Sequence, residues 1–350
     1  MDYRDIAGAE VAKRALVLAC AGGHGVILAG SEGAPVTELV EALPTIMGDV
    51  TAEEASAADE AVRRARGICD GLAELLAHEP PPAERAKLER ELERRTAAFD
   101  ELDRAMYSFM AGLRPITTVP ASAPLGDVLG GGRPPVPGAV TWAHGGVLHL
   151  KDAQDMGKMY LESIKTCAVD NEVRLVRADG VYTFPSRFMT VASCGQDREG
   201  VRHVLRSLAD VCPIACAVDR DGFDLSGRMD SDTMRDQVMA GRELAGWRQA
   251  HGVQTDCRAI FEALPTHAER LLEHHAERLG LSGDDVRRAA TVARTAADVA
   301  GREEIGENDI VEGLGFVPRV TTLCHPERGP ERVDEVQLPA REAGLPEEER

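Results

Sequence analysis

The sequence predicts an α/β fold: a parallel sheet with flanking helices, an inserted helical hairpin and a C-terminal α-helical lid. Three observations predict it. Short apolar runs alternate with helical stretches on both sides of an interruption, which is the pattern of βαβ units. The interruption, over residues 51–110, is rich in Ala, Glu, Arg and Leu. From Met234 onward, apolar residues recur only at helical spacing.

Composition limits the classes of partner. The chain has 350 residues, of which 43% are hydrophobic and 28% charged, as in globular proteins. A formal net charge of −19 and an aromatic content of 4% disfavour nucleic acid as a partner, because phosphate backbones bind clustered Lys and Arg. No apolar run approaches the length of a membrane span, and the N-terminus lacks the apolar segment of a signal peptide. We therefore expect a cytoplasmic protein without membrane contact.

The cysteines and histidines indicate no metal. Eight cysteines are scattered along the chain without a CxxC pair, which favours neither a disulfide scaffold nor a zinc site. His144, His149 and Cys194 lie near predicted strand ends and could be imagined as metal ligands. They have no ligand spacing, so packing is the favoured interpretation for all three.

The predicted α/β core comprises residues 1–50 and 111–232. It begins with a helix over residues 4–20 and a strand over VILA, residues 26–29. One more strand is predicted within residues 205–218. Short strands separated by helical stretches are predicted between these, in the runs AVTWA (139–143), GVLHL (146–150), EVRLV (172–176) and FMTVA (188–192).

Three further segments complete the predicted organisation. Residues 51–110 read as two amphipathic helices folded back at a triple proline, a structural hairpin or, alternatively, an arm that docks a partner. Residues 233–317 are predicted to form the helical lid, with Ser282 as the N-cap of one of its helices. Residues 318–350 are Pro- and Glu-rich, and we expect a disordered acidic tail.

The stretch GSEGAPVT, Gly30 to Thr37, lies where a nucleotide-binding protein carries its phosphate loop. It follows a predicted strand and precedes a predicted helix, as the pattern G-x-x-x-x-G-K-[ST] requires. Gly30 and Thr37 match that pattern, whereas Val36 stands at the lysine position. On a second interpretation, Gly30, Gly33 and Thr37 only close a strand-to-helix turn, for which glycine is well suited.

In order along the chain, these segments resemble the AAA+ ATPases of the magnesium-chelatase I-subunit type, in the ComM-like (YifB-like) branch. The resemblance covers roughly residues 2–46 and 112–317. Four blocks carry it: DYRDIAGAEVAKRALVLACAGGHGVILAG, GGGRPPVPGAVTWAHGGVLHL, EVRLVRADGVYTFPSRFMTVAS and LSGDDVRRAATVARTAADVAG. The resemblance implies an AAA+ P-loop-type fold with a β-hairpin insert, and it implies ATP and Mg²⁺ as cofactors.

The same resemblance indicates that the nucleotide site has decayed. The phosphate-loop lysine corresponds to Val36, and the Walker B Asp-Glu pair corresponds to Lys151 and Asp152, with a cation where Mg²⁺ should bind. Pro35 removes a backbone N–H from the loop, and Glu32 adds a negative charge. The resemblance also places sensor 1 at Cys194 or Gly195, the arginine finger at Val211, sensor 2 at Asp284, and another family arginine at Arg294.

Two functions compete on this sequence. The first is a catalytically inactive AAA+ protein that works by assembly with a protein partner or with copies of itself, as the related chelatase D subunit does with the I subunit. The second is a weak ATP-binding or ATP-hydrolysing ComM-like motor acting on DNA. Lys151 is expected to be a surface or salt-bridging residue, toward Asp152 or Asp155, and a replacement for the missing phosphate-loop lysine is the alternative. A third possibility is a chain without a retained role. ATP and Mg²⁺ are doubtful under the first function, and no other cofactor is predicted.

Overall fold

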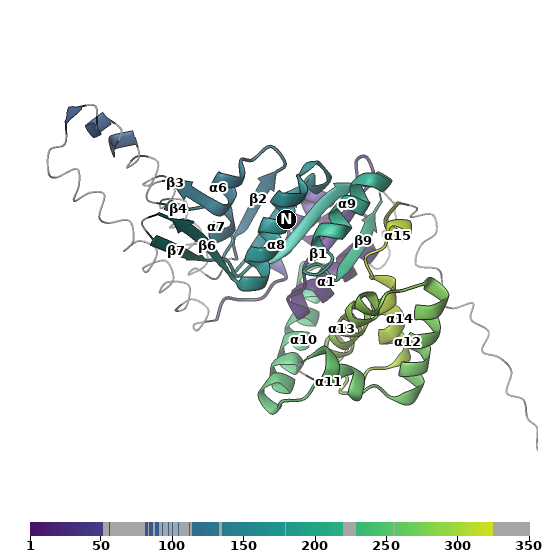
Figure 1. Ribbon diagram of the computed structural model, residues 1–350. Helices are drawn as coiled ribbons and strands as arrows, with labels where there is room; N and C mark the ends of the chain where they lie inside the picture. The colour runs from purple at the N-terminus through teal and green to yellow at the C-terminus, as the bar shows by residue number, and fades with distance from the viewer. Residues whose placement is uncertain are drawn as a thin grey trace, which may run out of the picture.

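A computed structural model describes residues 1–51, 114–132, 135–178, 180–219, 229–254 and 256–324, with Gly112 and isolated positions between 56 and 104 (Figure 1). Within these residues, the main sheet has five parallel strands in the order β2-β5-β8-β1-β9. The strands are β2 (Ile116–Pro120), β5 (Val147–Lys151), β8 (Met189–Gly195), β1 (Val26–Gly30) and β9 (Ile214–Val218). The predicted parallel α/β sheet is confirmed.

Helices cover both faces of the sheet because its strands are apolar on both sides. Val26 and Leu28 of β1 contribute to one buried cluster, which includes α1 (Glu10–Gly22) and α2 (Val36–Glu41). Alternate residues of the same strand, Ile27 and Ala29, contribute to the other cluster. That cluster is completed by α7 (Ala139–Trp142), α8 (Lys158–Asp170) and α9 (Arg198–Leu208) (Figure 1).

Two antiparallel pairs lie outside the main sheet. The first joins β3 (Gly130–Gly132) and β4 (Pro135–Pro137). The second is the hairpin of β6 (Glu172–Arg177) and β7 (Gly180–Pro185). The run EVRLV is therefore a strand, but it belongs to a hairpin and not to the parallel sheet. The remaining short elements are η1 (Tyr3–Asp5), η2 (Leu43–Thr45), α6 (Leu125–Leu129) and η3 (Ala153–Asp155).

Two predicted elements are wrong in type or extent. AVTWA was predicted as a strand and is the short helix α7, which begins directly after Gly138. A short apolar run has no periodicity that separates a buried strand from a buried helical turn. The helix predicted over residues 4–20 is two elements, η1 and α1, and α1 begins at Glu10 after a left-handed Ala9 with a φ of 58°.

The C-terminal region is helical, as predicted, and carries its own apolar cluster. Its elements are α10 (Ser231–His251), α11 (Cys257–Glu262), α12 (Thr266–Leu279), α13 (Gly283–Val299) and α14 (Glu307–Gly315). Ser282 caps α13 as expected, because its hydroxyl accepts a hydrogen bond from the Asp285 N–H. The small alanines of α13 allow α14 to approach closely, and α10 packs against both α1 and α13.

The predicted insert and tail fall largely outside the described residues. Only isolated positions of the hairpin predicted over residues 51–110 are described, and residues 325–350 are not. The segment predicted as tail, 318–350, starts with the short helix α15 (Val320–Cys324). Its Leu323 is fully buried, and α15 packs against α9 and β9 (Figure 1).

Candidate functional site

The candidate site lies at the carboxyl ends of the parallel strands, beside β1. After β1, the chain crosses to β2 at the far end of the sheet, beyond β8 and β5. Strand β9 pairs with the opposite edge of β1. In open α/β sheets, such a topological switch point is where ligands bind. The segment predicted as a phosphate loop, GSEGAPVT, runs from the end of β1 into α2 at this point.

Three backbone N–H groups of this loop form hydrogen bonds with carbonyl groups of the protein itself. The Ser31 N–H donates to the Val218 carbonyl at 3.0 Å, and the Ala34 N–H donates to the Ser31 carbonyl at 3.0 Å. The Val36 N–H donates to the Ala34 carbonyl at 2.8 Å, across a tight turn at Pro35. Pro35 itself has no N–H. Three donors of the loop are therefore engaged, and a fourth is missing.

The Val36 side chain packs over the end of β1. A Cβ added to Gly30 would lie 2.6 Å from Cγ2 of Val36, so the two residues are in close contact. Val36 and Ala34 are half-buried and pack against the apolar cluster beneath α1. Gly33 has a φ of 78°, a left-handed conformation that suits glycine, and Thr37 is exposed. At the position predicted from the sequence pattern to correspond to a phosphate-loop lysine, a methyl group of Val36 lies against the end of β1.

Lys151 and Asp152 follow each other at the end of β5. Lys151 is exposed, as expected of a surface lysine, and its ammonium forms no ion pair with any residue of the described ranges, Asp152 and Asp155 included. Asp152 is also exposed and takes a left-handed conformation with a φ of 57°. Its carbonyl accepts the Asp155 N–H at 3.0 Å, which begins η3.

Two glutamines and an aspartate, which the sequence analysis did not single out, link the strand ends. The Gln196 side-chain amide donates to the Asp219 carboxylate at 3.0 Å and to the Ala29 carbonyl at 3.4 Å. The Gly195 N–H donates to the side-chain carbonyl of Gln154 at 3.4 Å. Gln196 and Asp219 each follow directly after a strand of the sheet, which is the sequence signal that could have found them. Their contacts connect β8, β1 and β9 at the candidate site.

His149 is a residue of β5, the strand between β2 and β8. Its Nε2 is 2.9 Å from the Ser193 hydroxyl, and its Nδ1 is 3.4 Å from the Thr118 hydroxyl. Burial, reinforced by the ammonium of Lys151, lowers the pKa of His149 to about 4. A neutral imidazole that donates at one nitrogen and accepts at the other satisfies both contacts.

The other residues considered as metal ligands are also engaged in the fold. His144 accepts the Arg187 N–H at 3.1 Å through its Nδ1. Burial raises the pKa of the Cys194 thiol to about 12, so it is protonated at neutral pH. No group of three His, Cys, Asp or Glu side chains suited to a metal occurs among the residues that the structure describes.

The positions predicted for sensor 1, the arginine finger, sensor 2 and the further arginine are dispersed over the fold. Gly195 ends β8, Val211 follows α9, and Asp284 is in the first turn of α13, where it pairs with Arg287. Arg294 is buried within the lid. Its guanidinium pairs with Asp298 at 3.1 Å and donates to three further oxygens, of which the Gln254 side-chain oxygen is 2.8 Å away. Arg294 thus stabilises the lid from within.

Comparison with known proteins identifies two regions. Residues 2–77 and 88–208 match the family described as magnesium chelatase, subunit ChlI, and residues 228–316 match the C-terminal region of that subunit. An uncharacterized protein of Mycobacterium tuberculosis is 27% identical over 342 residues, covering 90% of this chain and 61% of the relative. Competence protein ComM of Haemophilus influenzae is 25% identical, with coverage of 92% and 61%.

Uncharacterized protein YifB of Escherichia coli is 24% identical, with coverage of 93% of this chain and 62% of the relative. The chain therefore spans less than two thirds of the length of these curated relatives. Among the described helices, none combines the length and the apolar character that crossing a membrane requires.

Proposed function

The chain belongs to the magnesium chelatase family of AAA+ proteins, and we propose that it is a non-hydrolysing member that acts as a structural or regulatory assembly partner. Phosphoryl transfer in P-loop proteins depends on positioned donors and cations around the phosphates. Val36 at the predicted lysine position and Lys151 at the predicted metal position support the proposal. The partner is a second protein or further copies of the chain.

The main support for the proposal is that backbone N–H groups of the loop form hydrogen bonds within the protein. A phosphate loop binds anions because several backbone N–H groups converge on an open concavity. Here Ser31, Ala34 and Val36 donate to carbonyls of the protein, and Pro35 has no N–H to offer. These three N–H groups would have to give up their present hydrogen bonds before a phosphate could use them, and the phosphate would have no lysine at position 36 to pair with.

Mg²⁺ fits the site no better than ATP. Mg²⁺ prefers carboxylate oxygen and water ligands, and the position that corresponds to the metal-binding Asp holds the ammonium of Lys151. Asp152 provides a carboxylate one residue later, but it lies beyond β5 and its backbone is turned into the left-handed region. We therefore derive no step of ATP hydrolysis through these residues.

Assembly does not require nucleotide if the lid is held in place by the protein itself. Arg14 of α1 forms a bidentate pair with Glu312 of α14, with N–O distances of 2.6 and 3.0 Å. Arg242 of α10 donates to the Cys20 carbonyl at 3.0 Å and to the Met47 carbonyl at 2.6 Å. These contacts hold the lid against the α/β core, so a surface made by both parts would keep its shape without ATP.

Steady-state ATPase measurements on the full chain test the proposal. We expect no turnover above background in the presence of Mg²⁺, with or without double-stranded DNA. Turnover that disappears in Lys151→Ala or Asp152→Asn would overturn the proposal and indicate a rebuilt site. Turnover that rises with DNA would favour the ComM-like motor instead. Val36→Ala serves as the matched control, because it changes the loop without removing a charge.

A further inference from the structure

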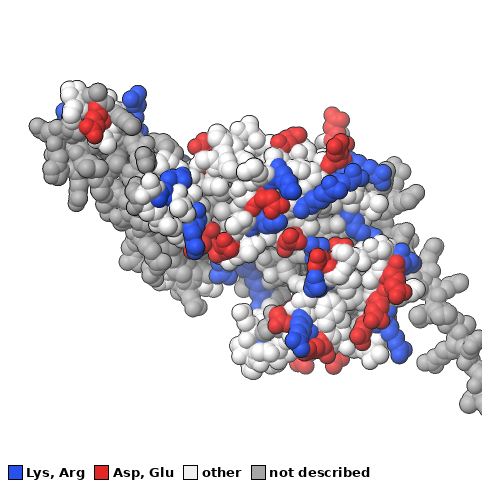
Figure 2. Space-filling view, in the orientation of Figure 1, with Lys and Arg blue, Asp and Glu red and all other residues white. Residues whose placement is uncertain are grey.

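A line of arginines runs along the outer face of α9. Arg198, Arg202 and Arg206 are spaced four residues apart, so they lie on one face at steps of about 6 Å. All three are exposed, and none forms an ion pair with another described residue. Figure 2 shows the blue side chains gathered over this helix. We call these three residues the arginine stripe; it stands out in a chain with a net charge of −19.

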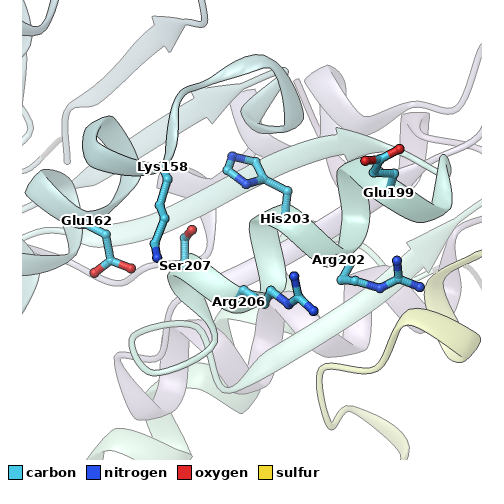
Figure 3. Close-up of a pocket in the computed structure, with 7 residues that line it drawn as sticks. All are labelled: Lys158, Glu162, Glu199, Arg202, His203, Arg206 and Ser207. Carbon is cyan, nitrogen blue, oxygen red and sulfur yellow. The ribbon is translucent and has the colours of Figure 1, made fainter.

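The stripe borders a groove between α8 and α9. The groove has a volume of about 360 Å³ and is lined by Lys158, Glu162, Glu199, Arg202, His203, Arg206 and Ser207. Lys158 enters from α8, whereas Arg202 and Arg206 project from α9 on the same side (Figure 3). Glu162 is engaged with Lys165 at 2.7 Å, which leaves Glu199 as the acidic group facing these cations. Cations therefore exceed free carboxylates around the groove.

The C-terminal segment of the chain begins beside this stripe. Helix α15 packs against α9, and Leu323 anchors it in the apolar cluster beneath. Burial raises the pKa of the Cys324 thiol; among the nearby charges, Arg198 and Arg202 lower this pKa and Asp197 raises it, so the last described residue lies close to the first two arginines of the stripe. Residues 325–350, which follow, carry eight acidic and four basic side chains.

We infer that the acidic segment 325–350 binds to the arginine stripe of its own chain as an internal ligand. Charge complementarity and the tether support this. For a random coil of this many residues, the root-mean-square span would be about 28 Å, whereas the stripe is about 12 Å long, so the chain length is sufficient to reach all three arginines. The tether gives an effective concentration in the millimolar range, which favours an intramolecular contact over a free acidic peptide. An acidic partner would have to displace the segment to reach α9.

Zero-length carbodiimide cross-linking of the full chain tests this inference, because it joins a lysine to a carboxylate in contact. The chain has only five lysines, and Lys158 is the one that lines the groove. We expect low-salt cross-links from Lys158 to glutamates between residues 327 and 349, and their loss at high ionic strength, where exposed charges are screened. Lys151, exposed and free of ion pairs within the described ranges, is the internal control and should yield none.

Variants test whether the arginine stripe itself binds the segment, as opposed to any positively charged surface of the protein. Arg198→Gln/Arg202→Gln/Arg206→Gln should lower the Lys158 cross-link about tenfold, because three exposed ion pairs add up to roughly 1.4 kcal/mol. Arg174→Gln/Arg177→Gln, on the β6–β7 hairpin, should leave it unchanged. Equal cross-linking of Lys151 and Lys158 would overturn the inference. So would cross-links that join differently isotope-labelled copies, because they would place the segment on a second molecule. Neither outcome depends on nucleotide binding.

Discussion

Val36 lies against Gly30, so close that a Cβ at Gly30 would be 2.6 Å from its Cγ2. This contact closes the turn between β1 and α2. It is possible because Gly30 has no side chain, and it occurs at the position that the sequence pattern assigns to a phosphate-loop lysine.

Gly30→Ala should destabilise the protein by about 1–3 kcal/mol through crowding with Val36. Val36→Ala should make room for the new methyl group, so the cost of Gly30→Ala should fall in the Val36→Ala background. Urea unfolding of the four chains of this double-mutant cycle measures the coupling between the two residues. Strictly additive effects would show that the contact does not close the turn.

The lid depends on a buried ion pair. Arg248 pairs with Asp298 inside the lid, and Arg294 pairs with the same carboxylate at 3.1 Å. Asp298→Asn should cost about 3–5 kcal/mol, because it removes the carboxylate with which both buried guanidinium groups pair. Asp284→Asn is the control, since Asp284 forms an exposed pair with Arg287 and should cost less than about 1 kcal/mol. Similar Tm shifts for the two variants would contradict this assignment.

His149 should make the protein less stable in mild acid. Its pKa is lowered to about 4 in the folded protein, against about 6.5 for an ordinary histidine. The unfolded chain therefore binds the proton more tightly, so stability is full above pH 6.5 and falls as the pH drops toward 4. The largest contribution of this one residue is about 3 kcal/mol. His149→Gln should reduce the slope of unfolding free energy against pH in this window, and an unchanged slope would exclude the effect.

The two ends of the region predicted as a hairpin insert are joined by Arg114. Its guanidinium donates to the carbonyls of Gly48 at 3.2 Å, Asp49 at 3.1 Å and Gly145 at 2.8 Å. A short Gly-Ser bridge in place of residues 51–110 should therefore leave the α/β core folded, as measured by circular dichroism and thermal unfolding.

The same replacement should abolish any specific partner association, if the insert is a docking arm. Arg114→Ala should destabilise both the full chain and the shortened chain by about 2–3 kcal/mol, through loss of charged hydrogen bonds. A shortened chain that does not fold would show that the insert is part of the core.

Some of this organisation could be predicted from the sequence, and the reasons are physical. Apolar runs such as VILA and GVLHL predicted buried parallel strands, because such strands are apolar on both faces. The run AVTWA is also short and apolar, but it forms a helix. The contact of Gln196 with Asp219 required the parallel register of β8, β1 and β9, which no local pattern contains.

In the loop, too, the residue types could be predicted from the sequence, whereas their contacts could not. The glycines and Val36 of GSEGAPVT pointed to a phosphate loop without its lysine. The internal hydrogen bonds of Ser31 and Ala34, in contrast, depend on the position of β9 and on the turn at Pro35. Local sequence therefore predicted which groups are present, and only the fold shows what they contact.

Calorimetry with Mg-ATP measures whether the natural chain binds nucleotide, and two variants serve for comparison. Val36→Lys/Pro35→Gly gives the loop the residues of the phosphate-loop pattern, and the addition of Lys151→Asp also removes the cation from the proposed metal position. We predict no heat of binding for the natural chain, little for the double variant and a clear gain for the triple variant. Saturable Mg-ATP binding to the natural chain would contradict the account, and a triple variant no better than the double would contradict the place given to Lys151.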